Sequence, residues 1–137
     1  MYDKFGQFIN GKWQKSSSGE TYEVINPANE EIIGKASKAN KKDIEEALKS
    51  AEKGLEVWKK TPPWQRSYII RKIADKMREK QDVLAKWMTL EVGKPFAEAK
   101  GEVGGAADIF EWNAEETKRI YGQTVEIRFV DTRVHVY

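Results

Sequence analysis

Short alternating stretches of hydrophobic residues open the chain, between residues 7 and 37. Phe8-Ile9 is followed by Asn10-Gly11 and then by Lys12-Trp13. Because Asn and Gly both tolerate positive φ, this order is typical of a tight turn between two antiparallel strands. The sequence therefore predicts a short β-hairpin at the start of the chain.

A second extended pair is predicted at residues 21–25 and 31–36. The first of these stretches, Thr-Tyr-Glu-Val-Ile, is rich in residues that favour strands, and residues 26–29 have the composition of a turn. Residues 14–20 are rich in Ser and Gly, and they are expected to form a flexible loop that joins the two pairs.

The hydrophobic period lengthens to that of a helix after Asn40. Asn40 is suited to cap this helix, and Asp43 suits the positive end of the helix dipole. The helix is expected to stop at Thr61-Pro62-Pro63, because a proline disfavours α geometry in the residue before it. Its apolar face is predicted to consist of Ile44, Ala47, Leu48, Ala51, Leu55 and Trp58.

Three further helices are predicted. One begins near Pro63, the next runs from about Asp82 to Val92 and ends at Gly93, and the last runs from Pro95 to about Tyr121. The apolar positions of the first two are Ile69, Ile70, Ile73, Met77, Leu84, Trp87 and Met88.

Gly101, Gly104 and Gly105 lie inside the last predicted helix. Each costs up to about 1 kcal/mol relative to alanine in a helix interior. We interpret them as positions of close packing against a neighbouring backbone, and a functional bend is the alternative.

The final residues return to strict alternation. Val125, Ile127 and Phe129 alternate with polar residues, and residues 133–137 alternate again after a turn signal at Asp131-Thr132. A self-contained domain seldom ends inside an alternating strand with open edges. We therefore expect a strand pair here, in a fold that is incomplete alone.

The charge is nearly balanced, with 24 Lys and Arg against 22 Asp and Glu and a net charge of +2. Neither sign dominates, so no nucleic acid or membrane surface is expected as a partner. Residues 1–6 contain no long apolar run, so neither a signal peptide nor a membrane span is expected, and a cytoplasmic location is the default.

The chain lacks the residues that most catalytic mechanisms require. The chain contains no cysteine and one histidine, His135, which excludes a thiol nucleophile and a histidine cluster within it. Residues 101–105 have the wrong spacing for a dinucleotide loop, and Gly93-Lys94 lacks the other residues of a P-loop. No catalytic or cofactor-binding residue is therefore assigned, and the five tryptophans are interpreted as core and interface anchors.

The chain as a whole resembles the N-terminal region of the aldehyde dehydrogenase superfamily. Singly its motifs are weak, but their order and spacing together are highly specific. They are residues 8–13 (FINGKW), 24–27 (VINP), 33–36 (IGKA), 58–66, 89–95 (TLEVGKP), 97–99 (AEA), 101–103 (GEV) and 112–122.

This resemblance implies an α/β fold of short β-hairpins and four helices. Residues 1–122 would form the N-terminal part of the cofactor-binding domain, and residues 123–137 would begin the β-hairpin through which subunits of the family assemble into homodimers or homotetramers. Members of the family oxidise aldehydes to carboxylic acids with NAD⁺ or NADP⁺, through a cysteine thiolate that attacks the aldehyde and a glutamate that activates water.

None of that machinery can be placed on this chain, so the chain alone is expected to be inactive, as the N-terminal segment of a longer parent enzyme. A non-catalytic interaction module derived from the family is the alternative. Residues 110–116 resemble the "EW-x-AEE" stretch of the semialdehyde-oxidising branch. Because Asn113 departs from the aromatic residue common there, betaine aldehyde, lactaldehyde and other semialdehydes all remain candidate substrates.

The resemblance also implies a metal site. Some members hold a monovalent cation through main-chain carbonyls before Asn-Pro and a carboxylate before Gly-Lys-Pro. In this sequence those positions are Val24, Ile25 and Glu91, and oxygen ligands of this kind suit a hard cation.

Overall fold

The computed structural model describes residues 6–137 and contains six strands and four helices. This set of strands and helices confirms the expected α/β fold. The expectation that the first residues carry no signal peptide falls mainly on residues 1–5, which lie outside the described residues. Within residues 6–137, no helix is long and apolar enough to cross a membrane.

Two antiparallel strand pairs form the N-terminal part. The hairpin predicted at Asn10-Gly11 is confirmed, because both turn residues have positive φ, 53° and 74°. In the second pair the register shifts between Val24 and Ile25, which marks a bulge at the end of the strand. The strands are β1 (Gln7–Ile9) paired with β2 (Lys12–Gln14), and β3 (Thr21–Ile25) paired with β4 (Ile32–Ser37).

The four predicted helices are present, with one boundary corrected. The last helix ends at Thr117 and not near Tyr121, because the amides of Lys118 and Arg119 bond to carbonyls three residues back and tighten the final turn. The helices are α1 (Lys41–Lys60), α2 (Pro63–Glu79), α3 (Gln81–Val92) and α4 (Phe96–Thr117).

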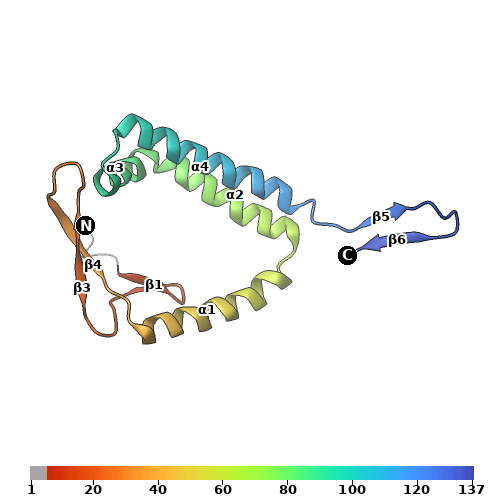
Figure 1. Cartoon of the computed structure of the whole chain (residues 1–137), viewed down its shortest axis with the longest axis horizontal. Helices are drawn as coiled ribbons and strands as arrows, with labels where there is room; N and C mark the ends of the chain where they lie inside the picture. Colours follow the sequence, from red (N-terminus) through yellow and green to blue (C-terminus); the bar gives the residue numbers. More distant parts are fainter. Residues whose placement is uncertain (1–5) are drawn as a thin grey trace.

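The packed part of the molecule is a three-helix layer in which α4 lies along α2 and contacts α3 (Figure 1). Its buried residues are almost all small, which lets the helix axes approach closely. They are Ala74 and Ser67 of α2, Ala85 of α3, and Ala99, Val103, Ala107, Ala114 and Thr117 of α4.

Helix α1 lies apart from this layer, on the opposite side of an open ring that the strand pairs close at one end (Figure 1). Its predicted apolar face is exposed: Leu48 has 64% and Leu55 59% of its surface accessible. The same holds for most tryptophans, since Trp64 and Trp112 are over 70% exposed. The interpretation of Trp64 and Trp112 as core anchors is therefore wrong within the described residues, and the interpretation of the tryptophans as interface anchors stays a prediction.

The interpretation of the α4 glycines is also wrong for the part of the chain that the structure describes. A Cβ added at Gly101 or Gly105 meets no atom within 4 Å. At Gly104 it would lie 3.1 Å from the Nε2 atom of Gln81, the far end of a flexible side chain. No neighbouring backbone in residues 6–137 requires glycine at these positions.

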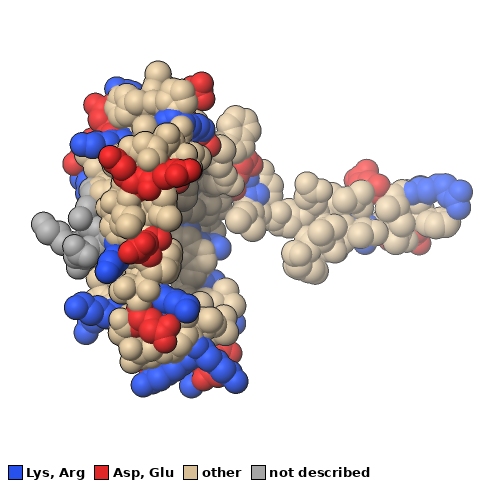
Figure 2. Space-filling view, turned by 60° about the vertical axis from the view of Figure 1, so that its left-hand side comes forward, with Lys and Arg blue, Asp and Glu red and all other residues tan. Residues whose placement is uncertain are grey.

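The predicted C-terminal strand pair is present as β5 (Gln123–Glu126) and β6 (Arg133–Val136), paired antiparallel. It projects away from the helices, and every one of its residues is exposed (Figures 1 and 2). On the face of the molecule in Figure 2, positive and negative groups are interspersed, as the balanced charge predicts.

Candidate functional site

The most deeply buried large side chain is Asp43, in the first turn of α1, with 2% of its surface exposed. The Oγ of Ser16 donates to Asp43 Oδ2 at 2.8 Å, and the main-chain amide of Ser17 donates to Oδ1 at 3.0 Å. Gln7 Nε2 and the amide of Asn40 also donate to Oδ2, at 3.2 and 3.1 Å. We call this group of five residues the Asp43 clasp.

The Asp43 clasp is also a capping box, because the Asn40 side chain accepts a hydrogen bond from the Asp43 amide. It ties the loop after β2 to the start of α1, so the expectation that the serines at 16–18 form a flexible loop is wrong. Burial by itself raises the pKa of the Asp43 carboxyl, but the hydrogen bonds from Ser16, Asn40 and Ser17 outweigh burial and hold the pKa well below its usual range. A carboxylate that stays ionised in this way is a structural anchor.

The segments predicted to share a cation lie against each other. Gly93, which ends α3 in the left-handed conformation, faces the turn after β3: a Cβ there would lie 3.0 Å from Pro27 Cγ and 3.3 Å from the amide nitrogen of Ala28. Gly93 is two residues beyond Glu91, and Pro27 is two residues beyond Ile25. The fold therefore brings the end of α3 beside the end of β3.

The donors that the prediction names in this region are the main-chain carbonyls of Val24 and Ile25 and the carboxylate of Glu91. Within residues 6–137 no group of three or more His, Cys, Asp or Glu side chains could hold a metal ion. The bulge between Val24 and Ile25 interrupts the regular strand pairing at the two residues whose carbonyls are predicted to act as ligands. Carbonyl oxygens with one carboxylate are a donor set that fits a hard monovalent cation.

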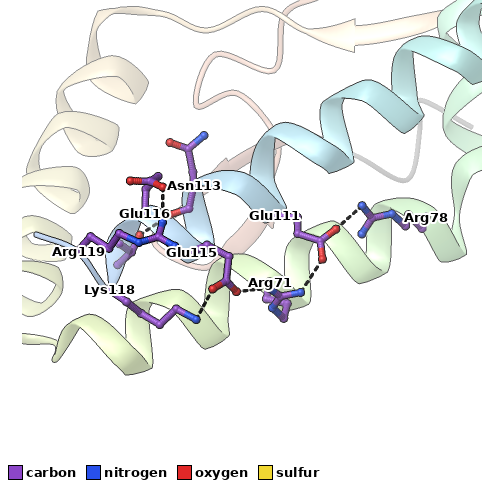
Figure 3. Close-up of polar contacts among 9 residues, drawn as sticks. Arg71, Arg78, Glu111, Asn113, Glu115, Glu116, Lys118 and Arg119 are labelled. Atoms are coloured by element: carbon purple, nitrogen blue, oxygen red, sulfur yellow. Dashed lines mark hydrogen bonds and ion pairs between the residues drawn. The ribbon is translucent and has the colours of Figure 1, made fainter.

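A network of ion pairs joins α2 to α4 (Figure 3). Arg71 donates to Glu111 at 2.6 Å and also to Glu115, and Arg78 donates to Asp108 at 2.7 Å and to Glu111 at 2.6 Å. The carboxylate of Glu111 thus lies between the two arginines. This α2–α4 ion-pair network fixes the two helices along their length.

The network also shows what the residues of the "EW-x-AEE" stretch do in this chain. Hydrogen bonds from Arg78 and Arg71 lower the pKa of Glu111, and hydrogen bonds from Lys118 and Arg71 lower that of Glu115. A general acid or base at neutral pH needs a pKa near 7, so these carboxylates are unsuited to proton transfer. The side chain of Asn113 turns back to donate to the carbonyl of Ile109 at 2.8 Å.

His135 lies on the exposed hairpin, where its Nδ1 is 3.1 Å from the Thr124 hydroxyl. Its side chain is exposed. In the part of the chain that the structure describes, the Asp43 clasp and the α2–α4 ion-pair network thus anchor and join helices.

Two features escaped the sequence reasoning. From the sequence, Asp43 is predicted only to interact favourably with the helix dipole. Asn40 and Asp43 have the spacing of a capping box, and this spacing could have revealed the second role of Asp43. Arg71 and Glu111 are 40 positions apart, and no local pattern pairs residues at that distance.

Comparisons with known proteins place these observations in a family. Residues 13–136 match the aldehyde dehydrogenase family. The chain is 43% identical to the glutarate-semialdehyde dehydrogenase of Pseudomonas putida over 129 residues, which cover 94% of the chain and 27% of that protein. It is also 43% identical to the NADP⁺-dependent succinate-semialdehyde dehydrogenase of Escherichia coli, covering 93% of the chain and 27% of that protein.

Solved structures agree. An NADP-dependent enzyme of Escherichia coli superposes with a TM-score of 0.86 at 41% identity, over 97% of the chain and 28% of that enzyme. A point mutant of betaine aldehyde dehydrogenase from Staphylococcus aureus, in complex with NAD⁺, gives a TM-score of 0.84 at 30% identity, over 93% of the chain and 26% of that enzyme. The chain therefore spans about a quarter of the length of the proteins it matches, in their N-terminal portion.

Proposed function

Because the chain belongs to the aldehyde dehydrogenase family, we propose that it is the N-terminal scaffold of an enzyme that oxidises an aldehyde to a carboxylic acid with NAD⁺ or NADP⁺. The match over residues 13–136 carries the proposal. The 43% identity to two semialdehyde dehydrogenases supports a semialdehyde, such as succinate or glutarate semialdehyde, as the substrate.

The proposed reaction divides between this chain and further polypeptide. The chain contains no cysteine, so the thiolate that attacks the aldehyde has to lie outside these 137 residues. The nicotinamide cofactor, when bound, accepts the hydride. The residues of this chain contribute rigidity: the Asp43 clasp anchors α1, and the α2–α4 ion-pair network aligns two helices.

The domain assignment is part of the proposal. Residues 1–122 belong to the cofactor-binding domain, and residues 123–137 begin the hairpin that joins subunits into a homodimer or homotetramer in the cytoplasm. The projection of β5 and β6 away from the helices supports this role, because both outer strand edges are available for pairing with another chain.

A chimera tests the proposed activity. This chain replaces the matched 27% of the Pseudomonas putida enzyme, and NAD(P)H formation is followed at 340 nm with glutarate semialdehyde. We expect kcat/KM within about tenfold of the intact relative, because the chain would supply scaffold and no reacting group. The 137-residue chain alone is the matched control and should form no NAD(P)H. A folded but inactive chimera would refute the proposed function.

We also propose that a monovalent cation binds the carbonyls of Val24 and Ile25 and the carboxylate of Glu91. Replacing choline chloride with KCl or NaCl at equal ionic strength should raise the Tm by about 2 °C, because a ligand that binds only the folded state stabilises it. Glu91→Gln should abolish this rise, and Glu98→Gln, a substitution of an exposed carboxylate on α4, should retain it. An equal rise in both variants would exclude the site.

The alternative function is a non-catalytic assembly module. The exposed hairpin of β5 and β6, visible in Figures 1 and 2, favours it. Such a module should form a defined oligomer of the chain alone in size-exclusion chromatography. Its chimera with the relative should then lack aldehyde-dependent NAD(P)H formation.

A further inference from the structure

The molecule exposes far more surface than a compact protein of its size. Its accessible surface is 10769 Å² for a mass of 15.8 kDa. A compact monomer of that mass exposes about 7,300 Å², so about 3,500 Å² is in excess. One partner in a large permanent interface contributes about 1,000–2,500 Å², so the excess on this chain is larger than one such contribution.

The open shape is shared with longer chains. The superposition with the Escherichia coli enzyme extends over 97% of this chain, so α1, α2 and the strand pairs have closely similar relative positions in that enzyme. The matched part is only 28% of that enzyme, and the other residues are available to cover the faces that are bare here. The excess surface is therefore an uncovered interface and not a sign of a loosely packed core.

One bare face forms a shallow, open groove between α2 and the start of α3. Ile69, Ile73 and Met77 recur every four residues along α2, and Leu84 of α3 completes the apolar floor. Ile69 is 38% and Ile73 40% exposed, whereas Ala74, the residue after Ile73, is fully buried. This repeat is the one by which a helix presents a hydrophobic stripe to a partner.

The rim of this groove is basic. Lys72 and Lys76 of α2 keep the same four-residue repeat, and Lys80, directly after the end of α2, continues it. Lys76 pairs with Glu79 on its own helix, and the ammonium of Lys72 lies 4.6 Å from the centre of the Tyr68 ring. Among residues 6–137, no carboxylate lines the groove itself. An occupant with carboxylates beside an apolar ridge would complement both floor and rim.

We propose that this lysine-rimmed groove docks an apolar segment flanked by carboxylates, in the polypeptide that supplies the remaining three-quarters of the dehydrogenase. The proposal rests on the proposed function. Its evidence is the excess surface, the basic rim and the length that relatives have beyond the matched part. A second copy of this chain is the competing occupant.

The test uses the chain and a separate polypeptide equivalent to the unmatched three-quarters of the Pseudomonas putida enzyme. The two are mixed, and their association is measured by analytical ultracentrifugation at several salt concentrations, together with NAD(P)H formation. We expect the two polypeptides to associate in a one-to-one ratio, whatever the size of the oligomer they form. Lys72→Glu/Lys76→Glu/Lys80→Glu and, separately, Ile73→Asp should each weaken it at least about tenfold.

The matched control is Lys42→Glu/Lys53→Glu/Lys60→Glu, which changes the net charge equally on α1 and should alter the Kd less than about twofold. Circular dichroism of each variant alone verifies that its helices remain. If the groove variants bind as tightly as the unmodified chain, the docking site is wrong while the activity stands.

The single-chain chimera separates the remaining outcomes. If the chimera is active but its two separated parts do not associate at about 10 µM, the docking proposal alone is overturned. The same holds if the chain dimerises through the groove and does not bind the other polypeptide. An inactive but folded chimera overturns the proposed function, and the docking proposal fails with it.

Discussion

Asp43→Ala should lower the Tm of the chain by about 5–10 °C at neutral pH, measured by circular dichroism. The substitution removes an acceptor that receives hydrogen bonds from Gln7, Ser16, Ser17 and Asn40. Loss of the carboxylate deprives these donors of their common acceptor and removes half of the capping box of α1. The loop after β2 should then separate from the helix.

The matched control for this substitution is Asp75→Ala, because Asp75 is exposed on α2. It should change the Tm by less than about 2 °C, as most exposed substitutions do. Equal losses in both variants would show that the clasp contributes little.

The pH dependence of stability offers a second readout. Because the pKa of Asp43 is lowered by folding, its contribution is complete above the pKa of the unfolded chain, about 4, and is lost as the pH falls toward the folded pKa. The Tm difference between the unmodified chain and Asp43→Asn should therefore be constant from about pH 7 to pH 5 and shrink below about pH 4. A difference that stays constant into acid would mean that the ionised carboxylate is not the stabilising group.

Local signals in the sequence were sufficient for most of the elements. Asn10-Gly11 fixed a hairpin, Pro63 began a helix and Gly93 ended one, because each of these residues limits its own backbone. The end of α4 was placed too late, since the residues after Thr117 remain compatible with a helix and only the tightened hydrogen bonds of Lys118 and Arg119 end it. Local propensity does not contain that information.

Burial and the anchoring side chains were harder to predict. Periodicity predicts which residues of α1 share a face, but it does not say which part of the structure packs against that face. Leu48 is therefore predicted from the sequence to lie in the core, although 64% of its surface is exposed in the structure. The pairing of Arg71 with Glu111 depends on how α2 lies along α4, which is a tertiary fact. The absence of cysteine is read directly from the sequence and requires no structure.

Gly93→Ala should destabilise the chain by about 2 kcal/mol and lower its Tm by about 6 °C. Gly93 has φ of 75°, in the left-handed region that costs other residues about 1–2 kcal/mol. The new Cβ would in addition lie 3.0 Å from Pro27 Cγ and 3.3 Å from the amide nitrogen of Ala28, so the turn after β3 has to shift. The same substitution should reduce the stabilisation by KCl, because it displaces the end of α3 from the proposed cation ligands.

The chain offers a control of opposite sign. Gly101→Ala introduces the same methyl group inside α4, where no atom lies within 4 Å of the new Cβ and the backbone is helical. It should stabilise the chain by about 0.4–1 kcal/mol, because alanine restricts the unfolded chain at a position that alanine can occupy without strain. Thermal and urea denaturation of both variants measure the difference. If Gly93→Ala matches Gly101→Ala, then the contact between the end of α3 and the turn at Pro27 does not hold these two segments together.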